Sequence, residues 1–286
     1  MLSNPIEKLI HDLEMERAKE YWEGVKRLKA QTEEQKNSRE AHQKKQLEYM
    51  RSVGIKLNEV EKDLEEDARK LKSYLELKRP PLISRPKHAT HFPTNLGGKL
   101  IPPSAGFVLP PDPGVVPPID PSQIKIENHH DGSGWDWLGG PTGFPKFVDV
   151  VFSFTPHQSA SYTFTACIAF HGFYFVQAHD GWLTSHHAEV SVFVSLKAFQ
   201  IIDRGWKFFP AVINREGDNI SEFDNFDQIV NFADTQDFRV DEPVVVTASI
   251  ELLAGAYGGG SHAEVNFQDG DANFIQPQGL WVSPVP

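Results

Sequence analysis

Hydrophobic residues follow two different periods along this chain, and the period changes once. Over the first 79 residues they recur every three or four positions, which is the spacing of an amphipathic helix. From about residue 122 they alternate with polar residues, as in strands with one buried face. The pattern predicts a heptad-bearing helical arm over 1–79, a partly packed proline-rich linker over 80–121, and an acidic β-sandwich domain over 122–286.

The helical arm carries two apolar stripes separated by a polar stretch. Residues 31–46 contain Ala41 as their one apolar residue, so this stretch cannot bury a seam. Either it bridges one long helix, or a turn near Asn37-Ser38 folds the arm into a helical hairpin. Gly54 weakens the second stripe by about 1 kcal/mol relative to alanine. The stripes consist of Leu2, Ile6, Leu9, Leu13, Ala18, Trp22, Val25 and Leu28, and then of Met50, Leu57, Leu64 and Leu71.

The spacing of seven between members of the second stripe is typical of a coiled coil. An amphipathic helix in water must bury its stripe against something. The next segment offers no core, so we expect a partner helix from this chain or from another. Residues 1–79 are therefore predicted to form a homo-oligomer or to dock on a protein partner.

The linker contains 12 of the 21 prolines of the chain. Proline removes backbone donors and disfavours helix, so the segment is expected to be extended. A solvated spacer does not need large apolar residues, yet many are interspersed here, and we expect parts of the linker to pack on a surface. These residues are Ile83, Phe92, Leu96, Leu100, Ile101, Phe107, Val108, Leu109, Val115 and Val116.

The C-terminal part predicts about eight strands in an antiparallel sandwich or jelly roll. One sequence is echoed within it. His187-Ala188-Glu189-Val190 and His262-Ala263-Glu264-Val265 each follow a strand with a similar pattern. We interpret the two occurrences as related hairpins of a pseudo-symmetric sandwich.

These hairpins carry the candidate metal ligands. His187 and Glu189 share one strand face, as do His262 and Glu264, because strand side chains alternate. Two facing pairs would make a site of two imidazoles and two carboxylates for a divalent metal. The His-x-His pair of a cupin is absent, because His186 and His187 are adjacent and point to opposite faces.

Two further groups are candidate ligand sites. Asp269, Asp271 and Asn273 have the alternating oxygen ligands of a calcium loop, although Phe274 stands where such a loop needs glycine. Glycine-flanked tryptophans either stack on sugars or close the end of a sandwich. The tryptophans in question are Trp135, Trp137 and Trp182.

Charge is concentrated in the C-terminal part, where residues 122–286 hold 7 basic and 20 acidic residues, a net charge of −13. Such a domain repels nucleic acid, so we expect no nucleic-acid partner. Cys167 is the one cysteine, which excludes an intramolecular disulfide. Neither a signal peptide nor an apolar run of membrane-spanning length is found, so a cytoplasmic protein, or one released without a classical signal, is expected.

The leading hypothesis is a non-enzymatic interaction or assembly protein, in which the helical arm oligomerises or docks and the sandwich presents a binding surface. Its basis is the architecture together with the absence of nucleophile-elbow, phosphate-loop and dinucleotide motifs. Two alternatives remain open. One is a metal-dependent β-sandwich enzyme or binder that uses the paired His and Glu residues, and the other is a carbohydrate-binding module on a stalk.

Overall fold

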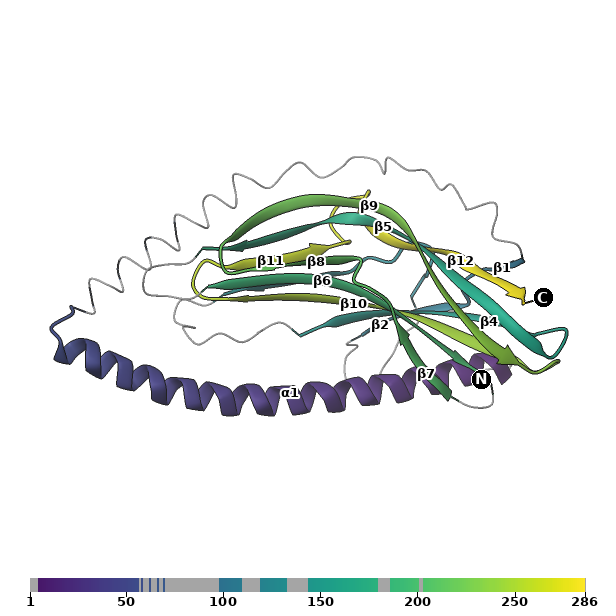
Figure 1. Ribbon diagram of the computed structural model, residues 1–286, viewed down its shortest axis with the longest axis horizontal. Coiled ribbons are helices and arrows are strands. Elements are labelled where there is room, and N and C mark those ends of the chain that lie inside the picture. The colour runs from purple at the N-terminus through teal and green to yellow at the C-terminus, as the bar shows by residue number, and fades with distance from the viewer. Residues whose placement is uncertain are drawn as a thin grey trace.

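The computed structural model describes residues 5–56, 98–109, 119–132, 144–179, 186–200 and 203–285, together with positions 58, 62, 66 and 69. Within these residues one N-terminal helix accompanies two antiparallel β-sheets that face each other as a sandwich (Figure 1). The predicted antiparallel sandwich is therefore confirmed, and the finer jelly-roll assignment stays a prediction. Among the described helical residues, no segment is long and apolar enough to cross a membrane.

Each sheet contains six strands. Sheet A has the order β1-β12-β5-β11-β3, with β9 on the other edge of β5, and sheet B has the order β2-β4-β10-β6-β7, with β8 also paired to β6. The strands of sheet A are β1 (Lys99–Ile101), β3 (Glu127–Asp131), β5 (Ala160–Ala178), β9 (Ile220–Phe238), β11 (His262–Asn266) and β12 (Phe274–Pro284). Those of sheet B are β2 (Ala105–Leu109), β4 (Lys146–Phe154), β6 (His187–Phe199), β7 (Asp203–Phe208), β8 (Ile213–Gly217) and β10 (Val244–Tyr257).

Strands β1 and β2 come from the segment that the sequence assigns to the proline-rich linker. Strand β1 pairs with β12 and β2 with β4, and Ile101 and Phe107 on these strands are buried. Most of the remaining linker lies outside the described residues. The three-domain division therefore stays a prediction.

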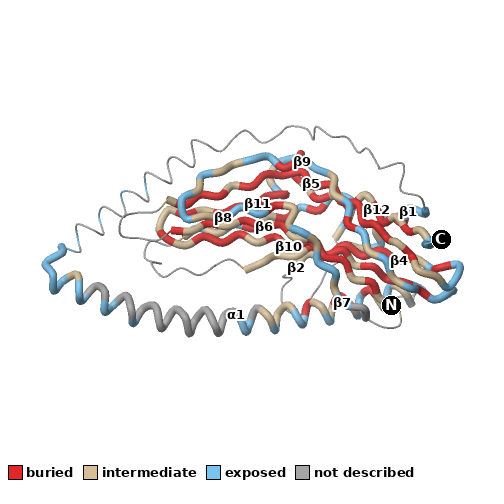
Figure 2. Tube along the Cα trace, in the orientation of Figure 1, coloured by how far each residue is buried: buried red, intermediate tan, exposed pale blue. Residues whose placement is uncertain are grey.

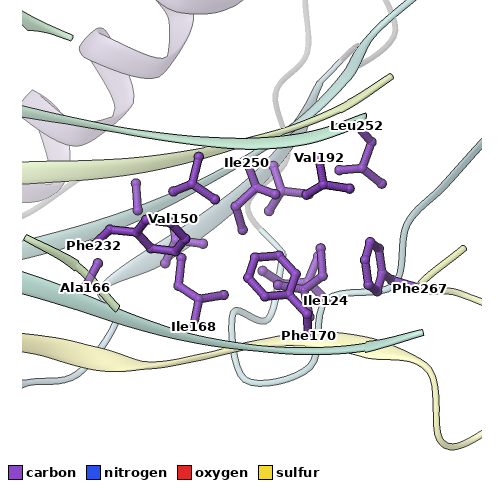
Figure 3. Packing of buried hydrophobic residues seen from close by; sticks show 14 of the residues in the cluster. Ile124, Val150, Ala166, Ile168, Phe170, Val192, Phe232, Ile250, Leu252 and Phe267 are labelled. Carbon is purple, nitrogen blue, oxygen red and sulfur yellow. The ribbon is translucent and has the colours of Figure 1, made fainter. Parts of the chain in front are cut away.

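The core fills the space between the two sheets, because alternate residues of each strand point inward. Large side chains such as Phe152, Phe170 and Phe267 are fully buried there. Figure 3 shows Ile168 and Phe170 facing Ile250 and Val192 across this space. Figure 2 shows that the buried residues gather in the central strands. The outward-facing residues of the same strands are thereby left to form the two outer faces.

The two predicted hairpins are wrong, because each connection crosses between sheets. Strand β5 lies in sheet A whereas β6 lies in sheet B, and β10 lies in sheet B whereas β11 lies in sheet A. The alternating pattern specifies which residues point inward, but it does not specify the sheet that a strand joins. The echoed sequences consequently occupy opposite sides of the sandwich.

Helix α1 (Pro5–Ser52) is continuous, and the turn expected near Asn37-Ser38 is absent. It ends where Gly54 adopts a φ of 83° and the Ile55 amide donates to the Met50 carbonyl. This is the glycine cap of a helix C-terminus. The helical-hairpin alternative is wrong, because the helix continues through the polar residues 31–46. Its backbone hydrogen bonds do not require an apolar seam at these positions. The coiled coil is not confirmed, because most of its second stripe lies outside the described residues.

The first stripe packs, through Ile6, Leu9, Leu13 and Ala18, against the protein's own sheet B, along whose outer side α1 lies (Figure 1). Ile10 and Ala18 are buried there against Phe107, Val151 and Val245. A sheet face therefore takes the place of the partner helix expected for this stripe. The outer face of sheet B is apolar at these three positions, so it matches the stripe.

Candidate functional site

The four predicted metal ligands do not form one site. His187 and Glu189 point outward from β6 in sheet B, whereas His262 and Glu264 point outward from β11 in sheet A. The intervening Ala188 and Ala263 are buried in the core between them. The sandwich interior therefore separates the two pairs, and each pair has its own neighbours from adjacent strands.

The outer face of sheet A brings polar and aromatic side chains together at one end. Glu264 lies opposite His129 of β3 on one side and opposite Phe175 of β5 on the other. Phe175 in turn lies opposite Phe223 of β9. We call this surface the sheet A face, and it consists of Glu127, His129, Asp131, Phe173, Phe175, Gln177, Phe223, His262, Glu264 and Asn266.

His262 is held between two carboxylates on the sheet A face. Its Nδ1 lies 2.6 Å from Asp131 Oδ1, and its Nε2 lies 3.4 Å from Glu264 Oε2. Burial lowers the pKa of His262, but the hydrogen bonds with Glu264 and Asp131 outweigh it, so that the pKa lies above its usual value. The imidazole is thereby biased towards its charged form, in which both nitrogens donate.

Asn266 gathers three carboxylates around one amide. Its Nδ2 donates to Glu264 Oε1 at 2.8 Å, to Glu127 Oε2 at 3.0 Å and to Asp269 Oδ2 at 3.0 Å. Its Oδ1 accepts from the backbone N–H of Gln268 and of Asp269, both at 2.9 Å, which fixes the orientation of the amide. Asn266 thus holds the three carboxylates in fixed positions close to one another.

Aromatic rings lie directly beside these acceptors. Phe173 and Phe223 stack with centroids 5.4 Å apart and an interplanar angle of 24°. The ring centroid of Phe175 lies 6.2 Å from that of Phe223 and 5.2 Å from that of His262. Next to His262, the Gln177 side chain is fully buried, and neither of its polar atoms has a hydrogen-bond partner among the described residues. The sheet A face therefore combines the apolar faces of aromatic rings with the side-chain amide of Gln177.

The predicted calcium loop contacts a lysine side chain. Lys125 Nζ donates to the carbonyls of Gly270 at 2.7 Å and Asn273 at 2.5 Å, so an ammonium group binds the loop's backbone oxygens. Asp271 is exposed, and Asp269 is bound to Asn266 instead. The structure therefore brings Asp269 close to Glu264. Metal binding by these residues stays a prediction.

The three candidate tryptophans, Trp135, Trp137 and Trp182, lie outside the described residues, so their predicted contact with sugars stays a prediction. Sequence reasoning missed Glu127, Phe175 and Phe223. The sequence holds no signal for Glu127, because all five residues of β3 are polar and show no alternation. No signal along the chain places β9 beside β5.

A buried ionic cluster lies between α1 and sheet B. Arg17 pairs with Asp149, which is fully buried, and donates to Ser249 Oγ at 2.6 Å. Burial and the charge of Asp149 raise the pKa of Glu14 to about 8. A neighbouring cavity of about 230 Å³ is smaller than a typical ligand pocket of roughly 300–1,000 Å³, and we assign this region to helix docking.

No family model and no curated protein matches this chain. Among solved structures, it resembles the module TmCBM61 in complex with β-1,4-galactotriose, with 11% identity over 49% of this chain and 65% of that one, at a TM-score of 0.20. A carbohydrate-binding module of Cellvibrio mixtus lichenase 5A in complex with cellotriose shares 12% identity over 58% and 88% of the chains, also at 0.20. Eiger TNF from S. frugiperda shares 13% over 52% and 96%, at 0.14. At these TM-scores the likenesses identify neither a family nor a ligand for this chain.

Proposed function

We propose that this chain is a non-enzymatic binding protein whose sheet A face binds a neutral glycan, while α1 braces the opposite sheet. One observation carries the proposal: on adjacent strands, the rings of Phe223, Phe175 and His262 adjoin a cluster of carboxylates. A sugar ring offers the complementary chemistry, because its C–H faces pack on aromatic rings while its hydroxyls donate to carboxylates.

The charge of the site favours a neutral ligand over an anionic one. The carboxylates of Glu127, Glu264 and Asp269 lie within reach of a single amide donor, that of Asn266. A sulfated or uronic glycan would add like charge to a part of the chain whose net charge is already −13. Hydroxyl groups, in contrast, satisfy the acceptors without bringing a charge.

The state of Cys167, the single cysteine of the chain, supports a binding role. Burial raises the pKa of the Cys167 thiol to about 11, so it stays protonated and unreactive at neutral pH. His171 lies four residues further along the same strand, and its Nδ1 is bound to Asp227 at 2.5 Å. Neither residue belongs to a nucleophile–base pair of the kind that covalent catalysis needs.

The assembly part of the proposal concerns the rest of the helical arm. The stripe from Ile6 to Ala18 packs on sheet B, so we propose that any oligomer or protein partner uses residues beyond it. The solution mass of the full chain, measured by light scattering, tests this. A dimer that survives Ala18→Glu supports it, whereas an oligomer that dissociates in this variant contradicts it.

A neutral-oligosaccharide screen followed by calorimetry tests the glycan site. Phe223→Ala removes an aromatic ring, and Glu264→Gln removes a charged acceptor. Each variant is expected to weaken binding about tenfold. For Glu264→Gln the reason is that one hydrogen bond to a charged group contributes roughly 1.5–3 kcal/mol. Phe208→Ala is the matched control, because Phe208 is 73% exposed on an edge strand of sheet B. Its affinity should equal that of the wild type.

Two results would overturn the glycan proposal. One is that both sheet A variants bind every retained oligosaccharide as tightly as the wild type does. The other is release of a shorter sugar during the incubation, which would make the protein an enzyme. Trp182→Ala is measured alongside, since this tryptophan is a separate candidate from the sequence.

A further inference from the structure

A second group of ligating side chains lies on the opposite side of the sandwich, on the outer face of sheet B. One imidazole nitrogen of His187 and one carboxylate oxygen each of Glu189 and Glu216 lie within 4.8 Å of one another. His187 and Glu189 are two residues apart on β6, so they share its outer face. Glu216 is the cross-strand partner of Glu189 on β8. Sheet pairing therefore adds to the predicted pair a third ligand from another part of the chain.

The His187 ring is held from two sides. Its Nδ1 lies 2.7 Å from Asp218 Oδ1, and its face stacks on Tyr257 with centroids 5.1 Å apart and an interplanar angle of 19°. A carboxylate that accepts from one imidazole nitrogen fixes the tautomer and leaves the other nitrogen to coordinate a metal. Asp218 therefore makes Nε2 the available ligand atom of His187.

A glycine provides space for the Glu189 carboxylate. Gly255 of β10 lies opposite Glu189, and a Cβ at this position would stand 2.9 Å from Glu189 Oε1 and 3.2 Å from its Cγ. The Glu189 carboxylate thus lies against Gly255, and a side chain on any other residue at position 255 would displace it. The carboxylates of Glu189 and Glu216 face each other across paired strands. A bound cation would offset the repulsion between the two carboxylates.

We propose that His187, Glu189 and Glu216 bind a divalent transition-metal ion, with Asp218 as a positioning residue. One imidazole with two carboxylates is a donor set suited to Zn²⁺ or Mn²⁺, whereas Ca²⁺ and Mg²⁺ prefer oxygen alone. The His187 side chain is 22% exposed and Glu216 is exposed, so an ion reaches the ligands from solvent. Three protein ligands leave coordination positions for water or for a further ligand.

This site is independent of the glycan proposal, because β6 and β8 belong to sheet B and the sheet A face lies beyond the core. It also differs from the site expected from the sequence, which joined His187 to His262. Here His262 belongs to the other face, and Glu216 of β8 takes its place.

The test is a calorimetric titration of the untagged full chain with Zn²⁺ after treatment with a chelator, repeated with Mn²⁺ and read by electron paramagnetic resonance. We expect one equivalent to bind to the wild type. His187→Gln and Glu216→Gln should abolish this stoichiometric binding, and Asp218→Asn should weaken it by about 10-fold or more, as expected for loss of a supporting hydrogen bond.

His262→Gln is the matched control, because His262 also lies between carboxylates but on the sheet A face. It should bind one equivalent as the wild type does. The proposal is overturned if the wild type binds neither ion, or if His187→Gln retains binding that His262→Gln loses. Circular dichroism of each variant confirms that the sandwich is folded, so that loss of the ion is not loss of the fold.

Discussion

At the scale of single residues, Arg17 connects α1 to sheet B through contacts of three kinds. It forms an ion pair with Asp149 and a hydrogen bond to Ser249. Its guanidinium also lies over two aromatic rings, 4.3 Å from the centroid of Trp206 and 5.5 Å from that of Phe147. A planar, permanently charged group satisfies all of these together, which a lysine ammonium does not.

Arg17→Ala is therefore expected to destabilise the protein by about 3 kcal/mol, because it leaves Asp149 buried and unpaired. Urea denaturation at neutral pH measures the change. Arg27→Ala is the control, since Arg27 is exposed on the same helix and should change stability by less than about 0.5 kcal/mol. Equal effects of the two variants would show that the buried pair does not stabilise helix docking.

The sequence carried little trace of this cluster. Arg17 resembles the other charged residues of a solvated helix face, and Asp149 resembles an outward-pointing acidic residue in a strand. Nothing along the chain relates positions 132 residues apart. For the same reason Glu189 was predicted from its spacing to His187, while Glu216 on the neighbouring strand was not.

At the scale of elements, α1 is a continuous helix whose first turns dock on a sheet. Ala18 is 5% exposed in this contact, where it belongs to the cluster that includes Val151 and Val245. A small residue there allows the helix to approach the sheet closely. The helix period was predictable from the sequence, whereas the surface that receives it was not.

Ala18→Glu should release the first part of α1 from the sheet, because burying an unpaired carboxylate costs several kcal/mol. Amide hydrogen exchange is the measurement. Faster exchange is expected over residues 5–24, with unchanged protection in β5 and β10. Lys19→Glu, at an exposed neighbouring position, should leave the exchange of the helix unaltered. Protection that survives Ala18→Glu would contradict the docked arrangement.

At the scale of the whole molecule, the interface between helix and sandwich makes stability depend on pH. Burial and Asp149 raise the pKa of Glu14 to about 8, from an ordinary value of 4.5. Between these values the folded protein keeps a proton that the unfolded chain has lost. The stability contributed by the protonated carboxyl is therefore fully present below pH 4.5 and is lost as the pH rises towards 8.

The expected result is that the wild type loses stability from pH 5 to pH 8 more steeply than Glu14→Gln does, by at most about 1.4 kcal/mol per pH unit. The free energy of unfolding is measured by urea titration at several pH values in one buffer system. Glu16→Gln, an exposed neighbour, should retain the wild-type slope. Parallel curves for wild type and Glu14→Gln would exclude Glu14 as the source.

The sequence by itself determined the local features of this protein: a helical N-terminal part, antiparallel strands with buried alternate positions, and an acidic C-terminal part. Each of these depends on neighbours a few residues apart, which the periods of helix and strand record. Tertiary structure alone decided that β5 and β6 join different sheets, that α1 docks on sheet B, and that His187 lies far from His262. These arrangements depend on contacts between distant segments, and a pattern that specifies only inward or outward cannot distinguish one sheet from the other.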